Sequence, residues 1–245
     1  MSWMIDGAYE NWEPSGDPDD RLGFVITTGA GSSTVDLDVA PDAVWTGAGA
    51  EVAEFVIVDT DFAYAYITGL AIDTFFCRFR FQIPTGHALN VASRFAAISA
   101  QYNAAFANIL GIFYLFNSAG TLGLYYDPYK TTLGTSSGLE FVGTISDDTV
   151  YDVQLNRDSS GAGNGSFEVW LDHSSALTGT LQTSSADADV DIFIVGSISS
   201  THSFTLQNDR IGYNANRQVK KAPLSGSRVM APFASRMVMG SGMVV

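Results

Sequence analysis

The sequence contains one cysteine, Cys77, so no intramolecular disulfide can form. Phe75, Phe79 and Phe81 share one face of a predicted strand with Cys77. We therefore expect the Cys77 thiol to be buried and chemically inert. No apolar run reaches the roughly 18 residues that a membrane helix needs. The start of the chain has neither a basic segment nor an apolar segment, so we expect no signal peptide and synthesis in a host cytoplasm.

Basic residues are scarce: 12 lysines and arginines stand against 26 acidic residues, and the formal net charge is −14. Proteins bind nucleic acid and anionic membranes through lysine and arginine, so we expect neither as a partner. The charge is also uneven. No acidic residue follows Asp209, whereas residues 211–245 contain five of the 12 basic residues.

Motifs for common catalytic centres are missing from the sequence. The histidines His87, His173 and His202 occur singly, without the HxH or HExxH spacing of a zinc site. There is no GxGxxG loop and no Walker lysine. We therefore predict no cofactor, with a calcium ion as the one alternative.

The alternative rests on Asp187, Asp189 and Asp191, which place carboxylates on one face of an extended segment at roughly 7 Å intervals. This spacing fits a solvated strand edge that resists aggregation, a calcium site, or a pair of catalytic carboxylates. The triplet does not begin an EF-hand loop, because Ile192 stands where that loop requires glycine.

Alternation of apolar and polar residues is frequent and predicts antiparallel strands. Residues 74–83, TFFCRFRFQI, place apolar side chains on one face and polar ones on the other, and SRFAAISAQY (93–102) is predicted to be its partner strand. Residues 151–155 and 167–171 alternate in the same way across a glycine-rich hairpin loop. Some twelve to fourteen such segments, without an amphipathic helix, predict an all-β protein of two packed antiparallel sheets.

The segments ILGIFYLFNSAGTLGLYYD (109–127), SDDTVYDVQLNRD (146–158) and GNGSFEVWLD (163–172) resemble the laminin-G and concanavalin A-like lectin/glucanase superfamily. Val150 and Tyr151 stand where that family often has Trp-His, and residues 170–173 stand where it often has Tyr-Leu-Asp-Gly. The resemblance covers about residues 22–215. It implies a jelly-roll sandwich of two curved sheets, which binds saccharide in many members.

We predict three parts: an N-terminal arm (1–21), the concanavalin-like sandwich (22–216) and a C-terminal arm (217–245). The C-terminal arm is basic, rich in methionine and broken by Pro, Gly and Ser, which favours docking onto an acidic neighbouring subunit. Its predicted partner-docking residues are Arg228, Met230, Phe233, Arg236, Met237 and Met239.

The glucanase branch of the superfamily carries a Glu-x-Asp-x-x-Glu strand. The nearest match begins at Glu168, but Trp170 and His173 occupy the later acidic positions. Glu168 and Asp172 would lie about 13 Å apart along a strand, whereas glycosidase pairs need about 5–9.5 Å. We therefore predict no catalytic residues and a protein that is not an enzyme.

Sugar binding is predicted for outward-facing side chains: Trp170 as an aromatic plate, with Glu168, Arg78, Arg80 and Gln154 as hydrogen-bonding groups. The leading prediction is a non-enzymatic structural or adhesive component of a bacteriophage virion, either a capsid decoration protein or a tail or fibre protein. Its partners would be like subunits in a homo-oligomer, other virion proteins or cell-surface glycan. The alternatives are a glycan-degrading enzyme with an atypical site and a free carbohydrate-binding module.

Overall fold

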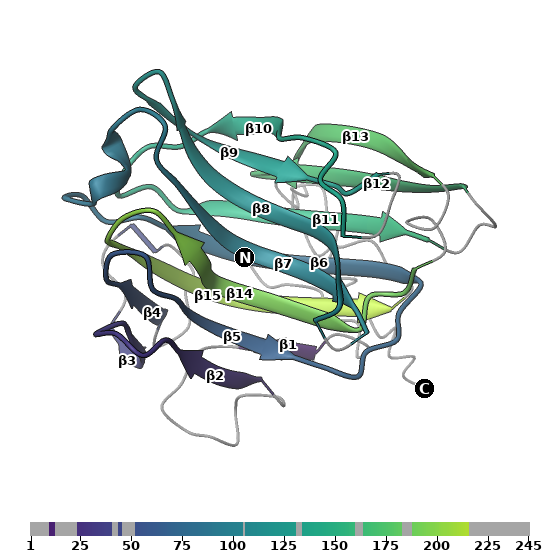
Figure 1. Cartoon of the computed structure of the whole chain (residues 1–245), viewed down its shortest axis with the longest axis horizontal. Coiled ribbons are helices and arrows are strands. Elements are labelled where there is room, and N and C mark those ends of the chain that lie inside the picture. Colours follow the sequence, from purple (N-terminus) through teal and green to yellow (C-terminus); the bar gives the residue numbers. More distant parts are fainter. Residues whose placement is uncertain are drawn as a thin grey trace, which may run out of the picture.

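Two antiparallel β-sheets lie face to face in the computed structural model of the chain (Figure 1). The structure describes residues 10–12, 24–40, 44–45, 52–104, 106–130, 134–159, 164–182 and 188–215. The predicted all-β sandwich is therefore confirmed. The described residues include no helix long and apolar enough to cross a membrane.

In the part of the chain that the structure describes, the two sheets contain eight and seven strands. Across the eight-stranded sheet the order is β13 (Ser174–Gln182), β12 (Asn164–Leu171), β11 (Tyr151–Asp158), β6 (Thr74–Gln82), β15 (Phe204–Ala215), β4 (Val52–Ile57) and β3 (Thr34–Val39), and β1 (Glu10–Trp12) also pairs with β15. Across the seven-stranded sheet the order is β10 (Glu140–Thr144), β9 (Thr121–Asp127), β8 (Asn108–Ser118), β7 (Phe95–Asn103), β14 (Ile192–Ser200), β5 (Ala63–Ile67) and β2 (Val25–Thr28). A short 3-10 helix, η2 (Ala88–Asn90), follows β6.

Strand pairing agrees with the sequence at one predicted hairpin and differs at one predicted pair. The hairpin of β11 and β12 is confirmed, with Leu155 opposite Val169. The predicted pairing of residues 93–102 with 74–83 is wrong: β7 pairs with β8 and β14, whereas β6 pairs with β11 and β15 in the other sheet. The residues between these strands carry the chain from one sheet to the other, so neighbours in sequence are not neighbours in a sheet.

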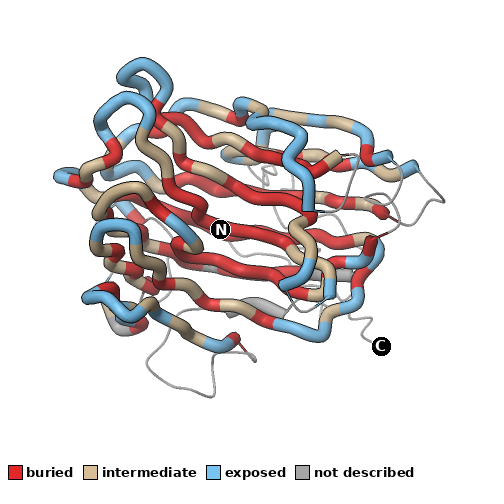
Figure 2. The backbone as a smooth tube through the Cα atoms, in the orientation of Figure 1, coloured by how far each residue is buried: buried red, intermediate tan, exposed pale blue. Residues whose placement is uncertain are grey.

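The main core lies between the two sheets, and β6 supplies its centre. Phe75, Cys77, Phe79 and Phe81 are fully buried, as their alternation predicts, and the Phe79 ring lies 5.6 Å from that of Phe113 on the opposite sheet. Burial raises the pKa of the Cys77 thiol above its usual value, which keeps it protonated and inert. Figure 2 shows buried residues along the central strands and exposed residues at loops and edge strands.

The predicted terminal arms are described only in part. Within the N-terminal arm, Glu10–Trp12 pair with residues 211–213 of β15, so this piece adds a short strand to the sandwich. The predicted C-terminal arm (217–245), with the docking residues Arg228, Met230, Phe233, Arg236, Met237 and Met239, lies outside the described residues.

Phe79→Ala is expected to lower the free energy of unfolding by about 3–5 kcal/mol, because it removes a fully buried ring and leaves a cavity between the sheets. Urea denaturation followed by fluorescence measures this loss. The control is Phe141→Ala, whose side chain is 52% exposed and whose loss should matter little. Equal destabilisation by the two variants would show that the core is not where the structure places it.

Candidate active site

The outer face of the eight-stranded sheet carries a set of polar side chains from β6, β11 and β12. These side chains alternate with the core residues and therefore point away from the seven-stranded sheet. Arg78, Gln154 and Trp170 lie opposite one another on these three adjacent strands. In the next row, Asp152 lies opposite Arg80. We call this set of residues, together with His173, the polar face.

Asp152 is the centre of the polar face. Its two carboxylate oxygens bind the Arg78 guanidinium, with Arg78 Nε 2.7 Å from Oδ1 and Nη2 bound to Oδ2. The Nε2 atom of His173 lies 3.2 Å from the same Oδ2. Arg78 and Asp152 are both more than nine-tenths buried, so their charges interact in surroundings that water screens weakly.

The second ring nitrogen of His173 is held by Gln154. Gln154 Nε2 lies 3.1 Å from His173 Nδ1, and an amide nitrogen can only donate. In this orientation of the Gln154 amide, His173 Nδ1 is the acceptor and Nε2 is the protonated nitrogen that donates to Asp152. The two contacts together assign the neutral tautomer, in which Nδ1 is the basic atom.

His173 reaches this place through an unusual turn. Asp172 and His173 form the two-residue connection between β12 and β13, and both have positive φ (48° and 68°). Glycine and asparagine are the usual residues in such turns, because other side chains are strained there by roughly 1–2 kcal/mol per residue. Asp172 Oδ1 accepts a hydrogen bond from the backbone N of Asp152 at 3.0 Å, and Asp172 N donates to Asp152 O at 2.9 Å, so the turn is fastened to β11.

Arg80 continues the polar face toward β15 and β4. Its Nη2 lies 3.0 Å from Oδ2 of the fully buried Asp209, and its guanidinium lies 5.2 Å from the centre of the Trp45 ring. Trp45 Nε1 donates to Gln207 at 3.2 Å, and Gln207 donates to Glu54 at 2.8 Å. These contacts hold a tryptophan and a cation next to the Asp152 group.

Several residues predicted to bind sugar share this face. Arg78, Gln154 and Trp170 are direct neighbours, Arg80 lies in the adjacent row, and Glu168 lies opposite Asn156 one row further on. Arg78, Arg80 and Gln154 are buried, whereas Trp170 and Glu168 are partly exposed.

The sequence reasoning missed Asp152 and His173 as partners of these residues. In the sequence, His173 lacks zinc-site spacing and departs from the glucanase motif, and Asp152 is only one polar residue of the alternating segment 151–155. A histidine at a hairpin position that favours glycine was the signal that could have drawn attention to it.

The predicted calcium site lies partly outside the described residues. Asp187 lies outside the described residues, Asp189 is exposed and Asp191 is partly buried. Within the described ranges, no group of three or more histidines, cysteines or acidic residues is placed to hold a metal ion.

The fold defines the class of this protein as a concanavalin-like jelly-roll sandwich. No protein-family model and no curated protein matches the chain by sequence. Among solved structures, it is similar to an endo-β-1,4-glucuronan lyase from the fungus Trichoderma reesei, with 13% identity over 84% of this chain and 94% of that one and a TM-score of 0.60. It is also similar to a carbohydrate esterase from the Shiga toxin-encoding bacteriophage phi24B, with 14% identity over 84% of this chain and 97% of that one and a TM-score of 0.56. A third similar structure is a PL-14 alginate lyase from Aplysia kurodai, with 8% identity over 84% of this chain and 98% of that one and a TM-score of 0.51.

These similarities contradict the prediction of a non-enzymatic virion component, because the structures that share the fold are mostly polysaccharide lyases. That prediction rested on the missing glucanase carboxylates, and the alternative prediction of a glycan-degrading enzyme agrees better with these similarities. Missing glucanase carboxylates exclude that hydrolytic mechanism, but they do not exclude a reaction that begins with removal of a carbon-bound proton.

Asp172→Asn is expected to make the protein more stable at pH 7. Desolvation raises the pKa of the Asp172 carboxyl, and the nearby Asp152 charge acts in the same direction, so the ionised form is disfavoured in the folded state. Asparagine keeps an acceptor for Asp152 N and tolerates positive φ. A group with a raised pKa costs stability when ionised, so the advantage of the variant should shrink as the pH falls from 7 to below about 4. Urea denaturation of both proteins across this pH range measures the difference in their free energies of unfolding. A stability advantage of Asp172→Asn that grows as the pH falls would contradict the prediction.

Proposed function

We propose that the protein is a polysaccharide lyase that cleaves a uronate-containing glycan by β-elimination on the polar face. The observation that carries the proposal is the hydrogen-bonded chain Gln154–His173–Asp152–Arg78, which contains a neutral histidine of assigned tautomer beside an amide and a guanidinium. The similarity of the fold to a glucuronan lyase supports the same reaction class.

The reaction needs three things from the protein. The uronate carboxylate must be neutralised so that the proton on the adjacent carbon C5 becomes acidic, a base must take that proton, and the departing O4 oxygen must receive one. The C5–H bond then gives its electron pair to a new C4=C5 double bond, and the C4–O4 bond breaks. Atoms balance without water or an external oxidant.

The polar face offers a group for each of the first two requirements. His173 Nδ1 is the proposed base, and Asp152 stabilises the imidazolium that forms when it accepts the C5 proton. Gln154 donates to Nδ1 in the free protein, and we assign its amide to the substrate carboxylate when substrate is bound. Arg78, held by Asp152, contributes positive charge beside that position.

The leaving oxygen can receive the same proton from His173 after C5 has lost it, since a single group close to both atoms can act as base and then as acid. Trp170 lies opposite Gln154 on the adjacent strand and is partly exposed. Its ring can stack against a neighbouring sugar of the chain. The arrangement would place the scissile bond between the histidine and the tryptophan.

A carbohydrate esterase is the second candidate, because the phage structure of similar fold is one and because an Asp–His pair also serves ester hydrolysis. Elimination is favoured because two of the structures of similar fold are lyases and because Gln154 contacts His173, where its amide could bind a uronate carboxylate.

Incubation with polyglucuronate, polymannuronate and polyguluronate tests the proposal. Elimination creates an unsaturated uronate at the new non-reducing end, whose ultraviolet absorbance reports the reaction directly. His173→Gly should lower the rate by about 100-fold or more, as expected for loss of a general base. Release of acetate from acetylated glycans without the absorbance change would favour the esterase, and no activity on any polyuronate would overturn the lyase.

The same variant should stay folded. Relief of strain at positive φ, about 1–2 kcal/mol, partly offsets the loss of the hydrogen bond to Gln154, about 1 kcal/mol, and of the one to the Asp152 carboxylate, about 1.5–3 kcal/mol. The free energy of unfolding should therefore fall by about 0.5–3 kcal/mol. Ala119→Gly is the matched control, because Ala119 is another exposed turn residue with positive φ (53°). It should keep full activity.

Trp170→Ala is expected to raise KM for a polymeric uronate about tenfold with little change in kcat, because loss of a stacking plate weakens ground state and transition state alike. Trp170→Phe should retain most of the affinity. Steady-state kinetics on one polymer decides this, and an unchanged KM would remove Trp170 from the binding surface.

The other expectations from the sequence belong with this proposal. A bacteriophage virion as location, like subunits or virion proteins as partners, and cell-surface glycan as ligand stay predictions, to which the similar phage esterase adds some support. Glu168 and Arg80 remain predicted sugar-binding residues at the ends of the polar face.

A further inference from the structure

The outer face of the seven-stranded sheet carries a row of aromatic rings where a two-layer sandwich usually has polar side chains. The rings follow one another at centroid distances of 5.5–6.0 Å. In order, the row is Phe62, Tyr64, Tyr66, Phe106 and Tyr102. We call it the aromatic row; it lies on the side of the sandwich opposite the polar face.

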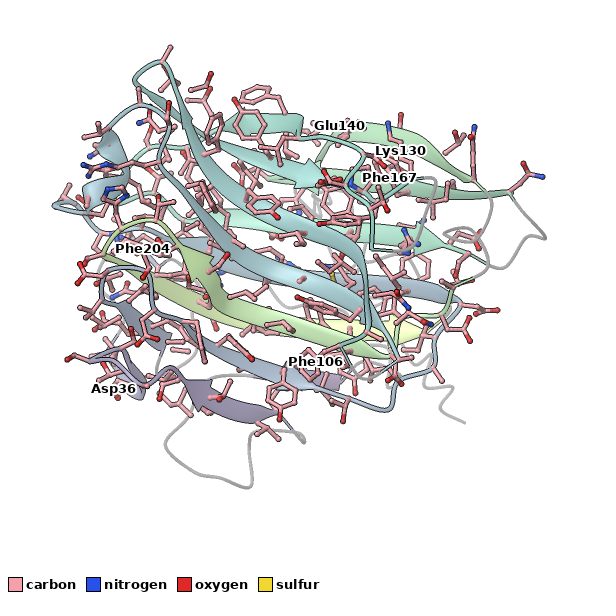
Figure 3. The ribbon with its side chains drawn as sticks, in the orientation of Figure 1. Asp36, Phe106, Lys130, Glu140, Phe167 and Phe204 are labelled. Carbon is pink, nitrogen blue, oxygen red and sulfur yellow. The ribbon has the colours of Figure 1, made fainter. Side chains whose placement is uncertain are left out.

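Phe106 is the most exposed member and the most strained. Its side chain is 43% exposed, and its φ of 65° is one that bulky residues rarely adopt. It sits in the β7–β8 turn, where its ring meets Tyr66 from β5 and Tyr102 from β7, each at 5.5 Å. Figure 3 labels Phe106 close to β5. An exposed aromatic side chain held in a costly backbone conformation is typical of a binding position.

The charges near the aromatic row are negative. Asp61 precedes Phe62, Asp191 N donates to Tyr102 O at 2.8 Å, and the exposed Asp189 accepts through its backbone O from Asn103. Two described basic side chains are engaged elsewhere: Arg94 with Ala88 O, and Lys130 with Glu140, which Figure 3 shows far from Phe106.

The tyrosines of the row add neutral hydroxyl groups. Partial burial raises the pKa of both Tyr64 and Tyr102, so their hydroxyls stay protonated at neutral pH. A surface of ring faces and neutral hydroxyls with acidic neighbours suits a ligand that has apolar C–H faces, many hydroxyls and no negative charge. A polyuronate does not meet the last condition.

We propose that the aromatic row is a second glycan-binding surface, which holds an uncharged polysaccharide while the opposite face acts on a uronate chain. Phe106 is the stacking plate, and the flanking tyrosines hold it and donate hydrogen bonds to sugar hydroxyls. Such a surface would keep the protein on a mixed matrix in which neutral and acidic glycans lie together.

Affinity electrophoresis tests this with hydroxyethylcellulose, mixed-linkage β-glucan and galactomannan in the gel, and with polyguluronate as the acidic comparison. Wild-type protein is expected to be retarded by at least one neutral glycan, and Phe106→Ala should weaken that binding about tenfold. Phe141→Ala is the matched control, because Phe141 is an exposed phenylalanine at the β10 edge of the same sheet. It should bind as the wild type does.

Phe106→Gly separates binding from folding, because glycine adopts a φ of 65° without strain. This variant should melt no lower than wild type and still lose binding. Retardation by none of the neutral glycans, or retardation that survives both Phe106 variants, overturns the proposal. Self-association of wild-type protein that disappears in Phe106→Ala, without glycan binding, also overturns it and identifies the row as a contact between copies. Activity on soluble polyuronate should be unaffected by either variant, so this test does not depend on the outcome for the polar face.

Discussion

Asp152 is the residue on which the chemistry of the polar face depends. Its carboxylate binds Arg78 through both oxygens and accepts from His173, and its backbone is fastened on both sides to Asp172. A buried carboxylate is tolerated only with such partners, and in return it fixes the position of the cation and the tautomer of the imidazole. Without Asp152, Arg78 would be a buried charge lacking its main partner, and His173 would lose the contact that defines its protonated nitrogen.

The sandwich separates two kinds of surface. Its interior is filled by large apolar side chains centred on β6, and the side chains that alternate with them point to the two outer faces. One outer face carries ion pairs and amides, and the other carries rings with few charges. Both proposed sites use residues at positive φ, His173 on one side and Phe106 on the other. In each case local stability is given up to hold a side chain where a ligand would need it.

The alternation of side chains made the strands and the core faces predictable, as the buried Phe75 and Phe79 show. Strand pairing was harder to predict from the sequence, because it depends on long-range packing and not on the local pattern of residues. The alanine-rich β7, for example, is a strand, but it lies in the opposite sheet from β6. Arg157 shows the limit of alternation. It continues the core-facing series of β11 and is fully buried, with Nη1 3.4 Å from Leu110 O and a pKa lowered by desolvation, although its charge alone would favour the surface. For the candidate site, the row of Arg78, Gln154 and Trp170 followed from their outward-facing positions, whereas the role of His173 required the hairpin geometry.

The central claim is that Asp152 and Gln154 hold His173 as a neutral base with its proton on Nε2. Two-dimensional nitrogen–proton NMR of the imidazole rings measures this directly, and the chain has only three histidines to assign. His87 is an internal reference for the same tautomer, because its Nδ1 accepts from Leu89 N at 3.1 Å and its Nε2 lies 2.8 Å from Asp147. The account predicts an Nε2-protonated His173 whose Nδ1 resonance shifts when an oligouronate is added. A proton on Nδ1, or a His173 spectrum that does not respond to the oligouronate, would contradict it.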